Sequence, residues 1–398
     1  MKILLVIPAL GQVYGGPSKI ALELADALSQ QATHVDLVTT NANGNTNLDV
    51  PLQTWLPTQS YRIQYFPHLG LGDYKISGSL TQWLFRHIKD YDLVHTIAVF
   101  SYPIAVTHWL CQRHNIPYIM NPQGMLEPWA LGYKAWKKRL FYILSEKEAL
   151  QNASALHMLS SSEAQRIEPL QLKTPIVIVP NGLHCQDYET LPAPDHFYRQ
   201  FPETQGKTLL LFLGRIDPKK GLDLLASAFA SVHQLFPKTH LIVAGQDNIG
   251  FLPTAKNYFA QANYPDAVTF TGMLTGKLKY SALAAVNLYV APSYSEGFSM
   301  SVLEAMASGL PCVITTGCNF PEAAHANAAK VVNIQADAIA QALIECLSDP
   351  LAAKSMGDRA RQLVLNHYTW DRVAAQLIDV YSAILDPRPL PAFSPPYL

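Results

Sequence analysis

Short apolar runs alternate with longer amphipathic stretches along most of the chain. In the first half, residues 18–30 follow the first apolar run, and residues 136–152 precede the run at 155; both have helical spacing of apolar positions. A strand of a parallel sheet is buried on both faces, so its sequence is continuously apolar. The alternation of such runs with helices predicts an α/β fold with a doubly wound parallel sheet. The apolar runs of this half are residues 2–7, 34–39, 93–96, 118–120, 155–158 and 176–179.

The alternation stops once and then resumes. Residues 185–207 contain Pro192, Pro194 and Pro202 and lack apolar periodicity, which predicts an interdomain linker. After it, apolar runs occur at residues 209–214, 240–244, 268–270, 288–291, 312–315 and 330–332, with helical patterns at 221–236, 277–285, 300–308 and 337–347. The pattern predicts two Rossmann-like domains in series, residues 1–184 and 208–366.

The C-terminal end departs from the strand–helix alternation. Residues 371–385 form a last amphipathic pattern, and we expect this helix to pack back on the N-terminal domain. Residues 387–398 contain five prolines, which predicts an extended or disordered tail.

The composition supports two folded domains and excludes some functions. A chain of 398 residues with 49% hydrophobic and 15% charged residues can bury large cores. A formal net charge of -1 argues against a nucleic acid partner. The five cysteines are odd in number and form no CxxC pair, which is typical of reduced, buried thiols rather than disulfides or a zinc site.

The first apolar run is too short for a secretory signal, and Pro8 and Gly11 follow it without a cleavage site of small residues. The sequence contains no apolar stretch of the length that a membrane span requires. We therefore expect a soluble, cytoplasmic protein.

Ligands of parallel α/β sheets bind at the loops that follow the carboxyl ends of the strands. The first such loop, residues 8–18, contains Gly15 and Gly16 and runs into a helix that starts near Pro17. Paired glycines let the backbone approach a ligand, and a helix start offers free N–H groups to an anion. The spacing does not match GxGxxG, and an ordinary turn is the alternative.

The loop after the run at 209–214 has the sequence GRIDPKKG. It places Arg215 at a strand end and Lys220 beside Gly221 at a helix start. A forked guanidinium and a compact ammonium suit a diphosphate. A solvated basic turn is the alternative.

The loop and helix at residues 292–304 carry two carboxylates eight residues apart, Glu296 and Glu304. Ser299 between them is a candidate N-cap, and the free N–H groups at residues 298–301 can hold an anion. Carboxylates accept hydrogen bonds from sugar hydroxyls. A favourable interaction with the helix dipole is the alternative.

Together these motifs resemble the retaining GT-B glycosyltransferases of family 4, the group 1 glycosyl transferases of bacterial polysaccharide and glycolipid synthesis. The resemblance covers about residues 1–385. It is carried by PSYSEGFSMSVLEAMASGLPCV at 292–313 with its E-x7-E, by GRIDPKKG at 214–221, by VPNGL at 179–183 and by the loop of Gly15 and Gly16.

The resemblance implies a GT-B fold, with two Rossmann-like domains facing across a cleft that holds a nucleotide-diphosphate sugar, and no metal or other cofactor. Glu304 would hold the ribose, Arg215 and Lys220 the diphosphate, and Glu296 the transferred sugar. The implied donor-binding residues are Gly15, Gly16, Arg215, Lys220, Gly245, Met273, Leu274, Glu296, Gly297, Phe298, Ser299, Met300, Ser301 and Glu304. The implied catalytic residues are Glu296, Arg215, Lys220 and His95, and the acceptor residues are Gln123, Gly124 and Glu127.

One position departs from the family. After the run at 118–120 the family often carries His or Arg before a glycine, whereas this chain has Gln123 before Gly124. An uncharged amide puts a transition-state role at this position in doubt. His95, at the end of another strand, is the alternative acceptor-facing candidate, although a packing role is equally open for it.

Donor, acceptor and location follow only from the habits of similar enzymes. UDP-glucose is the expected donor, with a GDP-sugar as rival, and a saccharide or lipid-linked saccharide is the expected acceptor. Residues 129–142 combine aromatic and basic side chains, which can mark contact with the cytoplasmic face of the inner membrane or border an acceptor groove.

Three other functions stay open. The first is a nucleotide-sugar epimerase or hydrolase of the same fold. The second is a dinucleotide-dependent oxidoreductase, which the missing GxGxxG and the ending of the second apolar run in Thr39 and Thr40 disfavour. The third is a non-catalytic partner of another transferase, which the intact charged motifs disfavour.

Overall fold

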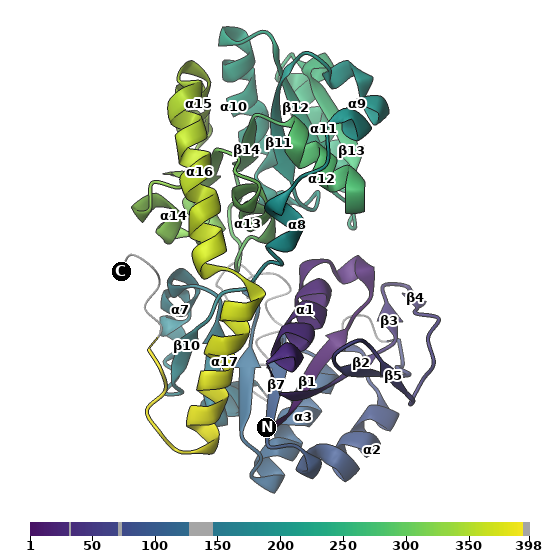
Figure 1. Cartoon of the computed structure of the whole chain (residues 1–398). Coiled ribbons are helices and arrows are strands. Elements are labelled where there is room, and N and C mark those ends of the chain that lie inside the picture. The colour runs from purple at the N-terminus through teal and green to yellow at the C-terminus, as the bar shows by residue number, and fades with distance from the viewer. Residues whose placement is uncertain (32, 71–73, 127–145, 393–398) are drawn as a thin grey trace. The chain divides into compact units, whose positions relative to one another are not determined.

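The computed structural model of the chain describes residues 1–31, 33–70, 74–126 and 146–392. The chain divides into two compact units. Unit 1 comprises Met1–Gly182 and the C-terminal segment from Trp370, and unit 2 comprises Leu183–Thr369. Figure 1 labels many of the elements of both units.

Unit 1 contains an eight-stranded sheet in the order β10-β9-β8-β7-β1-β2-β6-β5. All neighbouring strands are parallel except β5, which runs antiparallel to β6 at one edge. The order reverses between β1 and β7. The strands are β1 (Lys2–Ala9), β2 (His34–Thr40), β5 (Trp55–Pro57), β6 (Arg62–Phe66), β7 (Leu93–Ile97), β8 (Tyr118–Asn121), β9 (Ala155–Met158) and β10 (Ile176–Ile178). A separate small hairpin joins β3 (Ala42–Asn43) and β4 (Thr46–Asn47).

Helices cover this sheet. Helices α2 (Gly78–His87) and α3 (Tyr102–His114) share a buried apolar cluster with the β1 side chains Leu4 and Val6. Helix α1 (Gly16–Gln30) packs against α17 (Trp370–Leu385), the last helix of the chain. Two polar contacts fasten this pair: Trp370 Nε1 donates to Glu23 at 3.0 Å, and Gln31 Nε2 donates to the Asp371 carbonyl at 2.6 Å. Unit 1 also contains the short helices α6 (Lys147–Asn152) and α7 (Ser161–Arg166).

Unit 2 contains a six-stranded, wholly parallel sheet in the order β13-β12-β11-β14-β15-β16. Counted from the first strand of the unit, this is the 3-2-1-4-5-6 order of the Rossmann fold, with its reversal between β11 and β14. The strands are β11 (Thr208–Leu213), β12 (Thr239–Ala244), β13 (Val268–Gly272), β14 (Leu288–Ala291), β15 (Cys312–Thr315) and β16 (Lys330–Val332).

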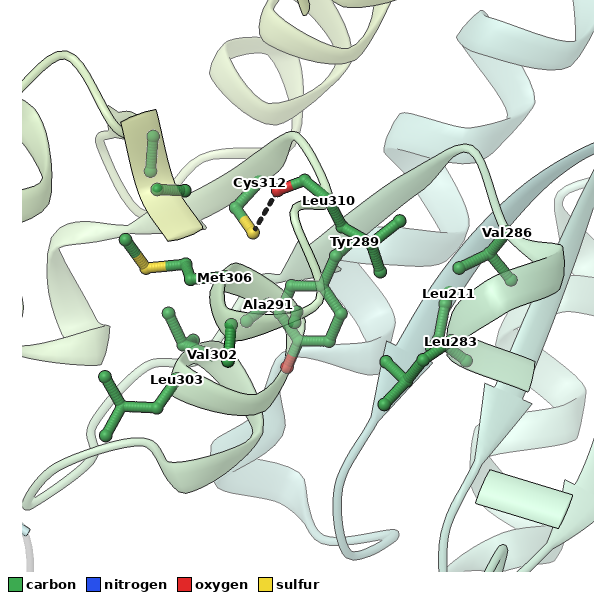
Figure 2. Packing of buried hydrophobic residues seen from close by; sticks show 14 of the residues in the cluster. Leu211, Leu283, Val286, Tyr289, Ala291, Val302, Leu303, Met306, Leu310 and Cys312 are labelled. Carbon is green, nitrogen blue, oxygen red and sulfur yellow. Dashed lines mark hydrogen bonds between the residues drawn. The ribbon is translucent and has the colours of Figure 1, made fainter. Parts of the chain in front are cut away.

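Alternate residues of β11 enter two different cores, as the two-residue period of a strand requires. Leu209 and Leu211 join a cluster with α12 and α13, whereas Leu210 and Phe212 join one with α10, α11 and α15. Figure 2 shows Tyr289 of β14 among the side chains of the first cluster. The helices are α10 (Leu222–Leu235), α11 (Leu252–Gln261), α12 (Gly276–Ala285), α13 (Met300–Ala307), α14 (Pro321–His325), α15 (Ala336–Ser348) and α16 (Pro350–His367).

The predicted fold class is confirmed, since two α/β units with parallel sheets are present. Residues 185–207, expected to link the domains, instead form α8 (Gln186–Glu189) and α9 (Asp195–Gln200) within unit 2. Tyr188 and Phe197 of these helices are buried. Helices of four and six residues are too short to show a periodic pattern of apolar residues. The prediction of a linker therefore rested on the prolines.

Two further properties bear on the sequence-based expectations. None of the five cysteines, all of which lie in described residues, forms a disulfide, and four of them are buried: Cys111, Cys312, Cys318 and Cys346. Among the helices of the described residues, none combines the length and the apolarity needed to cross a membrane.

Candidate functional site

The loops after β11 and β14 meet where the strand order of unit 2 reverses, the place where parallel sheets bind ligands. The Tyr294 amide donates to the Lys219 carbonyl at 2.8 Å, so the two loops touch directly. Gly221 has a φ of 69°, and a Cβ there would lie 2.1 Å from the Pro292 carbonyl oxygen. Only glycine therefore allows this approach.

Lys220 and Glu296 form an ion pair between these loops, with side-chain exposures of 11% and 8%. The Ser293 hydroxyl donates to the same Glu296 oxygen, Oε1, at 2.8 Å. Burial by itself raises the pKa of Glu296, but the charges of Lys220 and Lys219 and the hydrogen bonds outweigh it and lower the pKa below its usual value. The carboxylate thus stays ionised although its side chain is almost inaccessible to solvent.

The backbone around Glu296 is fixed from the next strand end. The Glu296 amide donates to the Gly317 carbonyl at 2.8 Å, and Asn319 Nδ2 donates to the Glu296 carbonyl. A Cβ on Gly317 would lie 2.2 Å from the Ser293 carbonyl oxygen. Ser293, Gly317 and Asn319 were not predicted. The bonds of Gly317 and Asn319 to Glu296 join residues that are far apart in the sequence, and such bonds leave no local pattern.

Helix α13 begins beside this pair. Ser299 occupies its N-cap position, as predicted, but its side chain makes no capping hydrogen bond. Its hydroxyl lies 3.3 Å from that of Ser301, which accepts a hydrogen bond from Tyr289 at 2.8 Å. The first-turn N–H groups, including that of Met300, have no partner within a helix and are suited to an anion. Gly297 precedes them, and the Phe298 ring packs 5.5 Å from Phe320.

Glu304, one turn further along α13, has a different partner. Lys279 of α12 places Nζ 2.9 Å from Glu304 Oε1. The two side chains are 14% and 10% exposed. Lys279 was not predicted, since nothing in the sequence connects it with Glu304.

The other predicted donor residues of unit 2 differ in accessibility. Arg215 is exposed at the end of β11, and Met273 is 56% exposed after β13. The Leu274 side chain is buried in the core, which leaves only its main chain for a ligand. A Cβ on Gly245 would lie 1.7 Å from the Gly214 carbonyl oxygen, so packing between strand ends already requires glycine there.

In unit 1, the predicted glycines lie at the start of α1, after the central strand. Gly15 is the N-cap residue with a φ of 70°, whereas a Cβ on Gly16 would meet nothing within 4 Å. The Ser18 hydroxyl donates to the Gly11 carbonyl at 3.2 Å and closes the loop. Open space therefore remains beside Gly16 at a helix N-terminus.

The predicted acceptor residues follow β8. Gln123 and Gly124 both have positive φ, 54° and 74°. Glu163 holds this turn: Oε1 accepts from the Gly124 amide at 2.6 Å and Oε2 from the Leu159 amide at 2.7 Å. Ser160 and Glu163 have the spacing of a capping box, a signal that could have identified Glu163 in the sequence. Of the two bonds of that motif, the one from the Glu163 amide to the Ser160 hydroxyl is present, whereas the carboxylate accepts from the Leu159 amide instead of the Ser160 amide.

Among the described residues, Gln123 Nε2 is buried and has no hydrogen-bond partner. Glu127 and the aromatic and basic segment 129–142 lie outside the described residues.

His95, predicted to face the acceptor, does not do so in this structure. It is completely buried, with Nδ1 2.7 Å from the Tyr381 hydroxyl and Nε2 3.3 Å from His157 Nδ1. Burial, together with the nearby His157, lowers the pKa of His95 well below its usual value. Through Tyr381, His95 joins α17 to the sheet, because its side chain lies in the interior of unit 1. Its position in the sequence did not reveal this burial.

The metal-ligating side chains that the structure describes include no group of three or more His, Cys, Asp or Glu suited to a metal ion.

Two family descriptions match the chain. Glycosyl transferases group 1 matches residues 195–363, and the glycosyl transferase 4-like domain matches residues 15–182. One matched region lies in each unit, and both descriptions are of glycosyl transferases. These matches support the predicted family, and they include every motif on which the resemblance was based except Leu183, the last residue of VPNGL.

The chain is similar to a phosphatidyl-myo-inositol mannosyltransferase of Mycolicibacterium smegmatis, with 29% identity over 228 residues, or 56% of each chain. The match thus spans little more than half the length of that curated relative.

Two solved structures share the GT-B fold. Sucrose-phosphate synthase from Thermosynechococcus elongatus has a TM-score of 0.78 and 22% identity, covering 98% of this chain and 100% of its own. HepE of Anabaena, in complex with UDP and glucose, has a TM-score of 0.76 and 17% identity, covering 96% and 100%.

Proposed function

We propose that this group 1 transferase moves a hexose, with retention of anomeric configuration, from a nucleotide-diphosphate donor to a saccharide or lipid-linked saccharide. The contact between Lys220 and Glu296 at the strand-order reversal of unit 2 carries the proposal. In such a donor the diphosphate is bonded directly to the sugar, so a cation for phosphate and an anion for hydroxyls must lie side by side. Lys220 and Glu296 meet that requirement.

The remaining roles follow from position. Arg215 and Lys220 would neutralise the diphosphate, assisted by the N–H groups at the start of α13. Glu304 would accept hydrogen bonds from the ribose. Gly245 and Met273 would border the base.

On the N-terminal side, Gly15 and Gly16 would lie beside the phosphate. Gln123 and Gly124 would contact the acceptor, and the unpartnered amide of Gln123 supports this assignment.

The proposed reaction needs no covalent enzyme intermediate. The acceptor oxygen bonds to the anomeric carbon while the bond from that carbon to the phosphate oxygen breaks. The leaving diphosphate takes the bonding electron pair, and the acceptor proton passes to a phosphate oxygen on the same face. The cationic groups would lower the barrier by stabilising the charge that develops on the diphosphate.

UDP-glucose is the proposed donor, supported by the UDP and glucose bound to HepE. A GDP-sugar is the rival, because the curated relative is named a mannosyltransferase. We propose that no divalent metal is required, since positive side chains and the N-terminus of a helix would neutralise the diphosphate in place of a metal ion.

Calorimetric titration tests the donor. The purified chain would be titrated with UDP, GDP, ADP, dTDP and NAD, each with EDTA. We expect micromolar binding of one nucleoside diphosphate without metal. Binding of NAD alone, or of none of the five, would contradict the proposal.

Product analysis tests the reaction. With the donor that binds, proton NMR of the first product should show the anomeric configuration of the donor in a new glycosidic bond. Conversion of the donor to an epimer, or to free sugar with no transfer to any acceptor offered, would support the alternative functions.

We also propose peripheral contact with the cytoplasmic face of the membrane. The exposed aromatic side chains of unit 1 include Phe85 of α2 at 57% and Trp109 of α3 at 53%. The Arg113 guanidinium lies 5.6 Å from the Trp109 ring, and the His114 ring lies 6.3 Å from that of Phe85. Exposed aromatic and basic side chains together favour an anionic lipid surface.

Vesicle sedimentation tests this contact. The whole chain should sediment with phosphatidylglycerol-containing vesicles and not with pure phosphatidylcholine. Phe85→Ser with Trp109→Ser should reduce sedimentation several-fold. Leu235→Ser, at a site 62% exposed on unit 2, is the control and should not. Equal sedimentation of all three proteins would refute the assignment.

A further inference from the structure

The carboxylate of Glu304 is nearly buried, with 10% of its side chain exposed, and it projects from the middle of α13. An ionised carboxylate in such a position needs a charged or hydrogen-bonding partner. Lys279 supplies one: its Nζ lies 2.9 Å from Oε1 of Glu304. The contact joins two helices that are 25 residues apart in sequence at this point.

Lys279 is itself held in place. Its amide donates to the Thr275 carbonyl at 3.3 Å in the first turn of α12, and its Nζ lies 5.0 Å from the Tyr280 ring. Tyr280 donates to Asp187 Oδ2 at 3.0 Å, which ties this part of α12 to α8. With 14% of its side chain exposed, Lys279 has little freedom to leave Glu304.

We infer that Lys279 is a positioning residue, which orients the Glu304 carboxylate toward the ribose and so makes the transferase select ribonucleotides over 2′-deoxyribonucleotides. The inference rests on the proposed function, in which Glu304 accepts from the ribose hydroxyls. A hydrogen bond from the 2′-hydroxyl to a charged acceptor is directional, so discrimination depends on the rotation of the carboxylate. The ammonium bound to Oε1 sets that rotation.

The test is calorimetric titration of the whole chain with UDP and 2′-deoxy-UDP, and with GDP and 2′-deoxy-GDP. The wild-type protein should bind the ribonucleotide at least about tenfold more tightly. Lys279→Met should weaken the ribonucleotide far more than the deoxynucleotide and bring the ratio close to one. Lys279→Arg should restore much of the preference, because it also donates to the carboxylate.

Lys277→Met is the matched control, since this lysine lies on the same helix and is exposed. It should keep the wild-type ratio. The ratio of two affinities measured on one preparation does not depend on the folded fraction, so partial unfolding of a variant cannot imitate the effect.

Two results would overturn the inference, and they are distinguishable. If nucleotides bind and Lys279→Met keeps the wild-type ratio, the ion pair only stabilises the fold, while the proposed function stands. If no nucleoside diphosphate binds the wild-type chain, the proposed function fails and this inference with it.

Discussion

The two glutamates of the E-x7-E motif have different partners, although they stand only eight residues apart. Glu296 lies in the loop before α13 and pairs with Lys220, whereas Glu304 lies within the helix and pairs with Lys279. Each carboxylate is nearly buried and is matched by one ammonium from a separate element. Their surroundings therefore support separate roles, which substitutions at the motif can test.

Lys220→Ala should weaken donor binding by about 1.5–3 kcal/mol, because it removes a charged hydrogen-bonding partner of the diphosphate. Calorimetry with the nucleoside diphosphate measures the loss. Lys238→Ala, at an exposed position of unit 2, is the control and should bind normally. Unchanged affinity in Lys220→Ala would remove this residue from the diphosphate site.

Substitution of the two glutamates should separate binding from turnover. Glu304→Ala should weaken the free nucleoside diphosphate as well as the sugar donor, since it removes the ribose acceptor. Glu296→Ala should leave nucleoside diphosphate affinity nearly unchanged and lower turnover. The same loss of nucleotide affinity in both variants would show that the assigned roles are wrong.

At the scale of elements, close approaches between backbones hold the site together. The loop after β11 contacts the loop after β14 at Gly221, and the loop after β15 contacts it at Gly317. Each approach leaves no room for a side chain. Correct placement of Lys220 against Glu296 thus depends on residues that carry no chemistry.

Gly221→Ala tests this dependence. The new Cβ would lie 2.1 Å from the Pro292 carbonyl oxygen, so we expect a loss of stability beyond the roughly 1 kcal/mol that a positive φ costs, together with weaker nucleotide binding. Gly206→Ala is the matched control, with a φ of 74° and nothing within 4 Å of the added Cβ. Urea unfolding compares the two. Equal losses would mean that the loops can move apart freely.

In unit 1, a buried polar cluster joins β7, β9 and α17. His95 contacts Tyr381 and His157, and His157 Nε2 lies 2.7 Å from the Val179 carbonyl oxygen. Burial lowers the pKa of His157 to about 4, although the bond to Val179 opposes this change. Two neutral imidazoles therefore fasten the last helix to the sheet.

This cluster predicts a pH dependence of stability. The unfolded chain binds a proton at His157 near pH 6.5, whereas the folded chain does so only near 4. The free energy of unfolding is therefore not reduced by His157 above pH 6.5. It decreases as the pH falls toward 4, by about 3 kcal/mol for this residue.

Urea unfolding between pH 7.5 and 4.5 measures this dependence. The change in the free energy of unfolding with pH should be smaller in His157→Gln than in the wild-type protein. It should be unchanged in the control His325→Gln, because the His325 side chain is exposed. A wild-type slope in His157→Gln would contradict the assignment.

At the scale of the whole molecule, the chain builds two units and returns from the second to complete the first. Helix α17 lies at the end of the sequence, yet Trp370, Val373, Leu377 and Tyr381 are buried within unit 1. It covers α1, which follows the first strand. Unit 1 is consequently incomplete until unit 2 and then α17 have been synthesised.

Truncation tests this dependence. A chain ending at Thr369 should expose the apolar surface of α1, bind a hydrophobic dye and lose the cooperative unfolding of unit 1. A chain ending at Arg388 keeps α17 and is the control. Native unfolding of the shorter chain would show that α17 is dispensable.

The sequence by itself determined the fold class, most strands and the charged motifs. Buried parallel strands must be continuously apolar, and each predicted strand of unit 2 lies within about two residues of an observed one. Strand β6, with polar residues at Arg62 and Gln64, lacked that signature and was missed. The longest helix of the described residues, α16, was also missed, because charged and small residues interrupt its apolar face.

Only the tertiary structure decided which side chains meet. The pairing of Lys279 with Glu304, the support of Glu296 by Asn319 and the burial of His95 all join residues distant in sequence. Such contacts arise from strand order and helix packing, which a local pattern of residues does not encode. The sequence thus specified the reactive groups, whereas the fold set their partners, their charge states and their access to a ligand.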